Sequence, residues 1–130
     1  MMTARESEMV GSVIAVWQPE APADALVGSQ AWARVIRQAR CTDSGLDADE
    51  WFPVSPGAHE ARREAAAAIA ICQACPVRSQ CLAISLRHWD IGQHGVWGGM
   101  VAAERASLRR QMLADRADAP SLPAGSAALA

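Results

Sequence analysis

Three cysteines fall within ten residues, in the stretch CQACPVRSQC from 72 to 81, with the spacing C-x2-C-x5-C. The fourth cysteine of the chain, Cys41, precedes this run by thirty residues. Four thiols in such an arrangement can bind an iron–sulfur cluster, bind a zinc ion or form structural disulfides. The function of the chain depends on which of these sites the cysteines make.

The spacing favours a cluster. Structural zinc sites usually take two closely spaced cysteine pairs, whereas here only Cys72 and Cys75 form a close pair. A cubane cluster is larger than one ion, and single cysteines from different helices can reach its corners. Zinc and disulfides stay open as alternatives, and so does simple burial of some cysteines as small apolar side chains.

Length and charge narrow the class of protein. A chain of 130 residues has room for one small domain with a modest core, which often needs a staple such as a metal. Residues 1–61 carry nine acidic residues and four arginines, and residues 62–116 carry eight arginines and four acidic residues. A net charge of −2 excludes strong independent DNA binding, although the second half could contact phosphates within a larger assembly.

The N-terminal part shows no targeting signal. The apolar run VGSVIAVW at 10–17 follows Glu6 and Glu8, whereas a secretory signal would follow positive charge. No run is long enough to span a membrane. We therefore expect a cytoplasmic protein with reduced thiols, for which metal or redox chemistry is favoured over disulfides.

The elements that must position the cysteines are predicted to be helices. Residues 31–40 repeat apolar side chains with helical spacing, namely Trp32, Val35, Ile36 and Ala39. The segment TDSGLDADE at 42–50 is typical of a loop. Residues 59–71 are strongly helical by propensity, with Ser55 and Pro56 as the expected start. One stripe of that helix is predicted to be buried: Ala61, Ala65, Ala68, Ile69 and Cys72.

Two further helices are predicted after Cys75. In residues 76–89, one face carries Val77, Cys81, Ile84 and His88, of which we expect His88 to be partly exposed. Residues 91–99 are glycine-rich and predicted to be non-helical, and a last helix covers 101–115. The fold class is therefore all-α, a small four-helix domain. We divide the chain into a flexible leader (1–28), a cysteine-bearing domain (29–116) and a disordered tail (117–130).

A family resemblance rests on three motifs: the remote cysteine followed by C-x2-C-x5-C, the sequence GVWGG at 95–99 before an arginine-bearing helix, and D-x-x-x-W-F-P at 47–53. Over residues 32–112 the chain resembles the WhiB-like proteins of actinobacteria and their phages. The resemblance implies four helices around one [4Fe-4S] cluster. The ligands that it implies are Cys41, Cys72, Cys75 and Cys81.

The resemblance also implies a function. Family members are transcription regulators, and several bind the C-terminal region of the primary sigma factor in the RNA polymerase holoenzyme. The cluster reacts with nitric oxide or oxygen, and apo forms can form disulfides. The partner contacts carried over to this chain are Trp32, Trp51, Phe52, Gly95, Val96, Trp97, Gly98 and Gly99. For the aromatic residues a role in the core is the alternative, and for Trp89 we expect the core.

Promoter DNA would be contacted weakly, or only in the complex, by arginines of the last helix. The candidates are Arg105, Arg109 and Arg110, with a solvated face as the alternative. Many relatives begin this helix with Thr or Ser and a Glu three residues later. Here Val101 precedes Glu104, so the capping box is incomplete and we expect a looser helix start.

Two other classes stay as alternatives: a zinc-stapled interaction module, and a C-x-x-C thiol oxidoreductase using Cys72 and Cys75. The catalytic motif usually sits at a helix N-terminus beside strands, where the pKa of the first thiol is lowered. Here Cys72 is predicted at a helix C-terminus, where its pKa should be raised, and no strand is predicted. We therefore expect a protein that is not an enzyme.

Overall fold

The structure is a computed structural model that describes residues 29–118. The predicted leader and most of the predicted tail lie outside this range, but Ala117 and Asp118 end the last helix. The described part is all-α, as predicted, with no strand and a single bridge between Trp97 and Met100. Its helices are α2 (Gln30–Gln38), α3 (Ala58–Glu64), α4 (Ala66–Gln73), α5 (Arg78–Arg87), α6 (Trp89–Gly92) and α7 (Ala102–Asp118).

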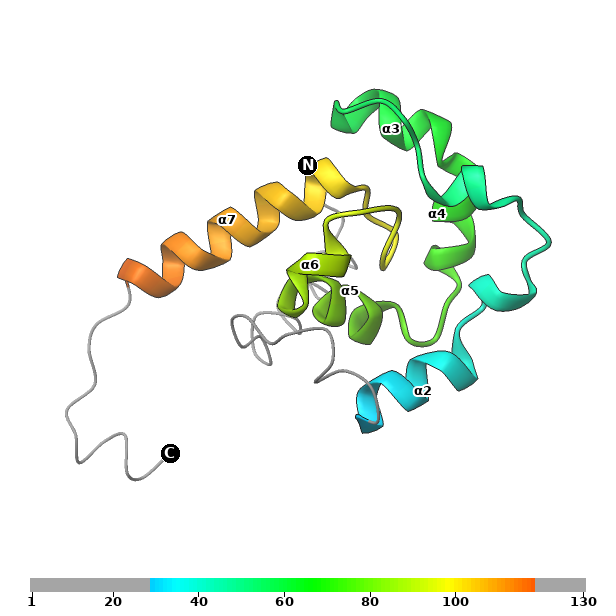
Figure 1. Cartoon of the computed structure of the whole chain (residues 1–130), viewed down its shortest axis with the longest axis horizontal. Helices are drawn as coiled ribbons and strands as arrows, with labels where there is room; N and C mark the ends of the chain where they lie inside the picture. The colour runs from blue at the N-terminus through cyan, green and yellow to red at the C-terminus, as the bar shows by residue number, and fades with distance from the viewer. Residues whose placement is uncertain (1–28, 119–130) are drawn as a thin grey trace.

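Helix α5 lies at the centre of the described part, with α6 packed on its C-terminal end (Figure 1). Helix α2 packs against α5, and α3 packs against both α4 and α7. Two 3₁₀ turns, Cys41–Asp43 and Ala48–Trp51, connect α2 to α3 where we predicted loop. These turns lie against α4, so the segment with the first cysteine runs beside the helix that carries the second.

Helix α2 begins at a side-chain cap, since the Ser29 hydroxyl accepts the Trp32 N–H at 3.1 Å. Val35 is buried, and it packs with Trp32 and Ala39 against residues of α5. Ile36 does not share this environment, because it is 52% exposed. The buried face of α2 is therefore narrower than the apolar face predicted from the sequence, since Ile36 is left outside the packing against α5.

The predicted alanine stripe is confirmed, because all five of its members are buried. The single predicted helix is divided, however, into α3 and α4 at Ala65 (φ −98°, ψ 15°). The predicted start is also wrong: the N-cap is Gly57, without a side-chain bond. Ser55 instead donates its backbone N–H to a Glu64 carboxylate oxygen at 3.2 Å, and its hydroxyl donates to the same carboxylate.

The end of α5 differs from the prediction in two ways. His88 is only 4% exposed, because it lies at the bend between α5 and α6, where its carbonyl accepts the N–H groups of Ile91 and Gly92. Residues 91 and 92 are helical, although we predicted none in the glycine-rich segment. A Cβ on Gly92 would lie 1.8 Å from the Ser85 carbonyl oxygen, so this bend requires glycine.

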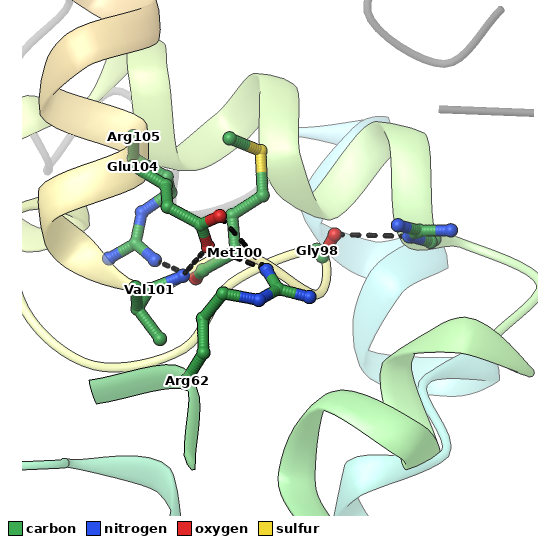
Figure 2. Close-up of polar contacts among 7 residues, drawn as sticks. Arg62, Gly98, Met100, Val101, Glu104 and Arg105 are labelled. Atoms are coloured by element: carbon green, nitrogen blue, oxygen red, sulfur yellow. Dashed lines mark hydrogen bonds and ion pairs between the residues drawn. The ribbon is translucent and has the colours of Figure 1, made fainter. Parts of the chain in front are cut away.

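Helix α7 has a firmer start than its sequence predicts. The Glu104 carboxylate accepts the Val101 N–H at 3.1 Å, which is the reciprocal half of a capping box. Arg62 of α3 donates to both oxygens of that carboxylate, at 2.8 and 2.9 Å (Figure 2). The ion pair supports the cap, and it joins α3 to α7.

Among the described helices, none alone is long and apolar enough to cross a membrane. Helices α4 and α5, bent by 117° relative to each other, meet the length and composition criteria only as a pair.

Candidate four-cysteine site

All four cysteines line one cavity of about 400 Å³. Its walls come from α2, α4, α5, the 3₁₀ turn after α2, and the segment from Gly95 to Gly98. Most of the other lining residues are apolar, with Arg78 as the charged exception. The fold thus brings together the cysteines that the spacing singled out, including Cys41, which is distant in sequence.

Each cysteine is positioned by a different local element. Cys72 is in the last turn of α4, and its carbonyl accepts the Cys75 N–H at 3.1 Å in the turn that follows. Cys81 is in the first half of α5, where its N–H reaches the Val77 carbonyl at 2.9 Å. Cys41 begins the 3₁₀ turn after α2 and is exposed. The cavity therefore has three thiols in or beside packed helices and one in a short exposed turn.

Burial is the main influence on these thiols. It raises the pKa of Cys81 to about 12, and it raises the pKa of Cys72 and of Cys41. Negative charge on Cys75 raises these three pKa values further. The four sulfurs therefore interact across the cavity. The raised pKa of Cys72 was expected, but its first cause is burial rather than the helix end.

The pKa direction of Cys72 bears on the alternative of a C-x-x-C oxidoreductase. A catalytic C-x-x-C motif needs a thiol whose pKa is lowered, and Cys72 is shifted the other way. Thiols with raised pKa values lose their protons when a positively charged metal centre binds them. The raised pKa of Cys72 is therefore unfavourable for nucleophilic attack by this thiol.

The glycines of GVWGG face the sulfurs through their backbone. The N–H of Gly98 bonds the Cys81 sulfur and the N–H of Gly99 bonds the Cys72 sulfur. Both glycines have positive φ, 59° and 80°, and a Cβ on Gly98 would lie 2.6 Å from the Leu82 Cβ. Both are buried. Their contact with a partner stays a prediction, for which burial leaves these two glycines little accessible surface.

The predicted partner-binding aromatics gather at the same cavity, which Trp32, Trp51, Phe52, Gly95, Val96 and Trp97 all help to line. Phe52 is 57% exposed, and its ring lies so close to Gly95 that a Cβ there would be 2.8 Å away. The Val96 N–H donates to the Trp51 carbonyl at 2.9 Å. The WFP and GVWGG segments thus form one surface beside the cavity.

The tryptophans were predicted either to contact a partner or to pack in the core, and Trp32 and Trp97 have features of both environments. Trp32 and Trp97 pack against the core cluster of Val35, Val77 and Ile84, yet each keeps part of its surface accessible. The Trp97 indole N–H donates to the His94 carbonyl at 2.9 Å, which holds the ring in one orientation. Trp89 packs on the cluster that contains Leu82, as we predicted for a core residue.

The three candidate DNA-contacting arginines have three different environments. Arg105 has no exposed surface, and its guanidinium donates to backbone carbonyls. It is unavailable to DNA, so that prediction is wrong for Arg105. The Arg109 guanidinium carbon lies 5.2 Å from the centre of the Trp89 ring. Arg110 is exposed and donates to the Ser107 hydroxyl.

A second buried arginine was not singled out from the sequence. Arg78 is 9% exposed, and it donates to the Gly98 carbonyl at 3.1 Å and to the Gln73 side chain at 3.0 Å. Arg78 lies two residues after Pro76, at the start of a predicted helix, and this position gives no sign that its side chain is buried. The only sequence feature that could have indicated burial is the position of Arg78 between Cys75 and Cys81, and an exposed arginine would fit that position equally well.

The donor set fits an iron–sulfur cluster. Four thiols, the preferred ligands of such clusters, line a single apolar cavity. Within residues 29–118, no three Cys, His, Asp or Glu side chains converge closely enough to hold one metal ion, and tetrahedral zinc needs its four sulfurs about 2.3 Å from a common point.

Fold and site together define a small all-α domain organised around four cysteines. The family model of the transcription factor WhiB matches residues 36–108, which is more than half of the chain. The chain therefore belongs to the WhiB family of transcription regulators. This match includes all four cysteines and GVWGG and lies within the segment 32–112 on which the resemblance was based.

Curated relatives agree with this assignment. The chain is 34% identical to the transcriptional regulator WhiB2 of Mycobacterium tuberculosis over 73% of this chain and 98% of that protein. It is 39% identical to WhiB1 of the same organism over 57% of this chain and 82% of that protein. With WhiB2 of Mycolicibacterium smegmatis the identity is 35% over 58% of this chain, and the match spans about half of that protein (53%).

Proposed function

We propose that this WhiB-family regulator holds a [4Fe-4S] cluster on Cys41, Cys72, Cys75 and Cys81 and binds the primary sigma factor of RNA polymerase beside it. The observation that carries the proposal is the single cavity of about 400 Å³ that all four cysteines line. When bound, the cluster supplies sensitivity to redox state and to nitric oxide. The protein acts where RNA polymerase does, in the cytoplasm.

The residues of the chain have separate parts in this function. The four thiols give up their protons to bind the centre, and the N–H groups of Gly98 and Gly99 bond two of the sulfurs. The apolar lining limits water at the site. Cys41 joins the turn after α2 to the helices that carry the other three ligands, so occupancy of the site controls how these elements are held together.

The sigma-binding surface is the aromatic one beside the cavity. Phe52 is its most exposed member at 57%, and Trp51, Val96 and Trp97 adjoin it. Partly exposed aromatics held by backbone bonds make good interface anchors, because they bury large areas at little cost in flexibility. Since the surface and the ligands share one cavity wall, loss of the cluster would change the surface that the partner meets.

Promoter DNA is a secondary partner in this proposal, contacted through α7 only within the complex. Arg110 is exposed on α7, and Arg109 is partly exposed. The exposed acidic residues Asp115 and Asp118 lie on the same helix and weaken its attraction to phosphates. The contribution to affinity is therefore expected to be small and sensitive to salt.

The first test is the composition of the protein purified without air. A visible absorption spectrum with iron, sulfide and zinc assays should show about four irons and four sulfides per chain. Each of the four single Cys→Ser variants should lose the cluster. A colourless protein with one zinc would contradict the cluster and leave a zinc-stapled module with the same docking surface.

The second test is binding to the C-terminal region of an actinobacterial primary sigma factor, measured by titration calorimetry without air. Phe52→Ala and Trp97→Ala should each weaken binding by about tenfold or more, as loss of an aromatic anchor costs at least about 1–2 kcal/mol. Ile36→Ala is the matched control, since Ile36 is exposed to a similar extent (52%) but does not line the cavity. Equal affinities for all three variants would contradict the proposed surface.

A further inference from the structure

The buried guanidinium of Arg105 binds the backbone of the segment that follows α6. It donates to the carbonyl oxygens of Gly92 at 2.7 Å, Gly95 at 2.6 Å and His94 at 3.1 Å. It also donates to the carbonyl oxygen of Met100, which Figure 2 shows. Arg105 thus contacts both ends of the 92–100 segment. An arginine can do this because its guanidinium carries five N–H donors in a fixed plane.

A second arginine holds the middle of the same segment. Arg78 of α5 donates to the Gly98 carbonyl at 3.1 Å, and its guanidinium lies 3.2 Å from where a Cβ on Gly99 would be. The segment is therefore fixed between α5 and α7 through main-chain oxygens. The two arginines that hold the segment, Arg78 and Arg105, are not among the four proposed ligands.

The opposite side of this segment faces the sulfurs. The carbonyl of Gly98 accepts from Arg78, while the N–H groups of Gly98 and Gly99 bond Cys81 and Cys72. Arg105 also interacts by charge with both of these thiols, and Arg78 interacts with Cys72. Two positive charges therefore lie behind a site that becomes negative when its thiols lose their protons.

We infer that Arg105 is a positioning residue for the four-cysteine site. By holding the 92–100 segment through its carbonyls, Arg105 aims the Gly98 and Gly99 N–H groups at the sulfurs and places a permanent positive charge behind them. N–H donors and positive charge stabilise the more electron-rich state of a thiolate-bound cluster, and so raise its reduction potential. Because Arg105 belongs to α7, the inference also links that helix to the electronic state of the site. It rests on the proposed cluster.

The test compares Arg105→Gln and Arg105→Lys with wild type in two measurements. One is the reduction potential of the cluster by spectroelectrochemistry without air. Arg105→Gln should shift it to a more negative value, and Arg105→Lys should shift it less, since lysine keeps the charge but not the planar set of donors. The matched control is Arg116→Gln, because Arg116 is exposed on the same helix and should leave the potential unchanged.

The second measurement is hydrogen–deuterium exchange of residues 93–100 in the reduced full-length protein without a cluster. Arg105→Gln should raise exchange in this segment while the protection of α4 stays as in wild type. This measurement separates the two proposals: a wild-type protein that binds no cluster contradicts the proposed function, and the exchange result still decides whether Arg105 positions the segment.

An Arg105→Gln protein with native helical circular dichroism, unchanged potential and unchanged exchange would overturn the inference. If that variant does not fold, Arg105→Lys and Arg78→Gln are measured in the same way, with Arg87→Gln as the exposed control on α5. Shifts no larger than those of the controls would overturn it equally.

Discussion

The two sides of the four-cysteine site are built differently. Cys72, Cys75 and Cys81 lie in or between packed helices, behind a segment that two buried arginines hold. Cys41 lies in an exposed 3₁₀ turn whose main side-chain bond is from the Thr42 hydroxyl to the Ala39 carbonyl. One side is formed by packed helices, and the other is an exposed turn that lies against α4.

This difference suggests a division of labour within the site. The helical side keeps its geometry whether or not a centre is bound, because its contacts are between protein groups. The Cys41 side gains most of its order from the bound centre, since binding energy and folding energy are shared at such sites. Loss of the centre is therefore expected to release the turn after α2 first, and the predictions below test this asymmetry.

The largest effect is expected for a methyl group added at glycines on the two sides. Gly98 and Gly45 both have positive φ, 59° and 73°, but only Gly98 is crowded by neighbouring atoms. Gly98→Ala should lower the free energy of unfolding by about 2–5 kcal/mol, the sum of left-handed strain and overpacking. Gly45→Ala should cost about 1–2 kcal/mol from strain alone. Urea unfolding measures both, and equal losses would contradict the asymmetry.

Thiol reactivity should separate the two sides next. Burial raises the pKa of Cys81 to about 12, and it also raises the pKa of Cys41, but Cys41 is exposed to the reagent. In reduced protein without a cluster at about pH 8, iodoacetamide should modify Cys41 on the order of a hundredfold faster than Cys81, because attack requires an accessible thiolate. Peptide mass spectrometry over a time course gives both rates. The Cys81 rate should keep rising with pH up to its pKa, and comparable rates at about pH 8 would count against the structure.

Hydroxyl substitution of the ligands gives a smaller contrast. In protein without a cluster, Cys72→Ser should lower the unfolding free energy by about 1–3 kcal/mol, because a buried hydroxyl loses water without gaining an assured partner. Cys41→Ser should change it by less than about 0.5 kcal/mol, as is usual for surface positions. Thermal unfolding followed by circular dichroism tests the pair, although both variants should lose the cluster equally in the loaded protein.

The smallest effect is expected where α3 meets α7 behind the helical side. Glu104→Ala removes the acceptor of the Val101 N–H and of Arg62, and should cost about 1 kcal/mol. The control is Glu60→Ala, which removes the more exposed 3.6 Å pair with Arg63 and should cost less than about 0.5 kcal/mol. Chemical denaturation distinguishes them, and similar values would show that the half capping box contributes nothing.

The features that the sequence predicted well depend on local periodicity. The alanine stripe through α3 and α4 and the site-facing position of Cys72 follow from the helical repeat alone, and the cysteine spacing indicated which thiols would meet. Features that depend on tertiary packing were missed. The burial of Arg105 and His88 depends on the bend at Gly92, and that bend follows from the close approach to Ser85. The break at Ala65 has no marker in a run of four alanines.

The polar contacts of the 92–100 segment with the arginines and the sulfurs run through its main chain, by donors to its carbonyls and by N–H groups that it offers to the sulfurs. Contacts of this kind do not depend on which side chains the segment carries, apart from its crowded glycines. An exposed side chain such as that of Gln93 can therefore diverge over evolution without disturbing the thiols. A domain with this construction can acquire new binding partners while it conserves one chemical centre.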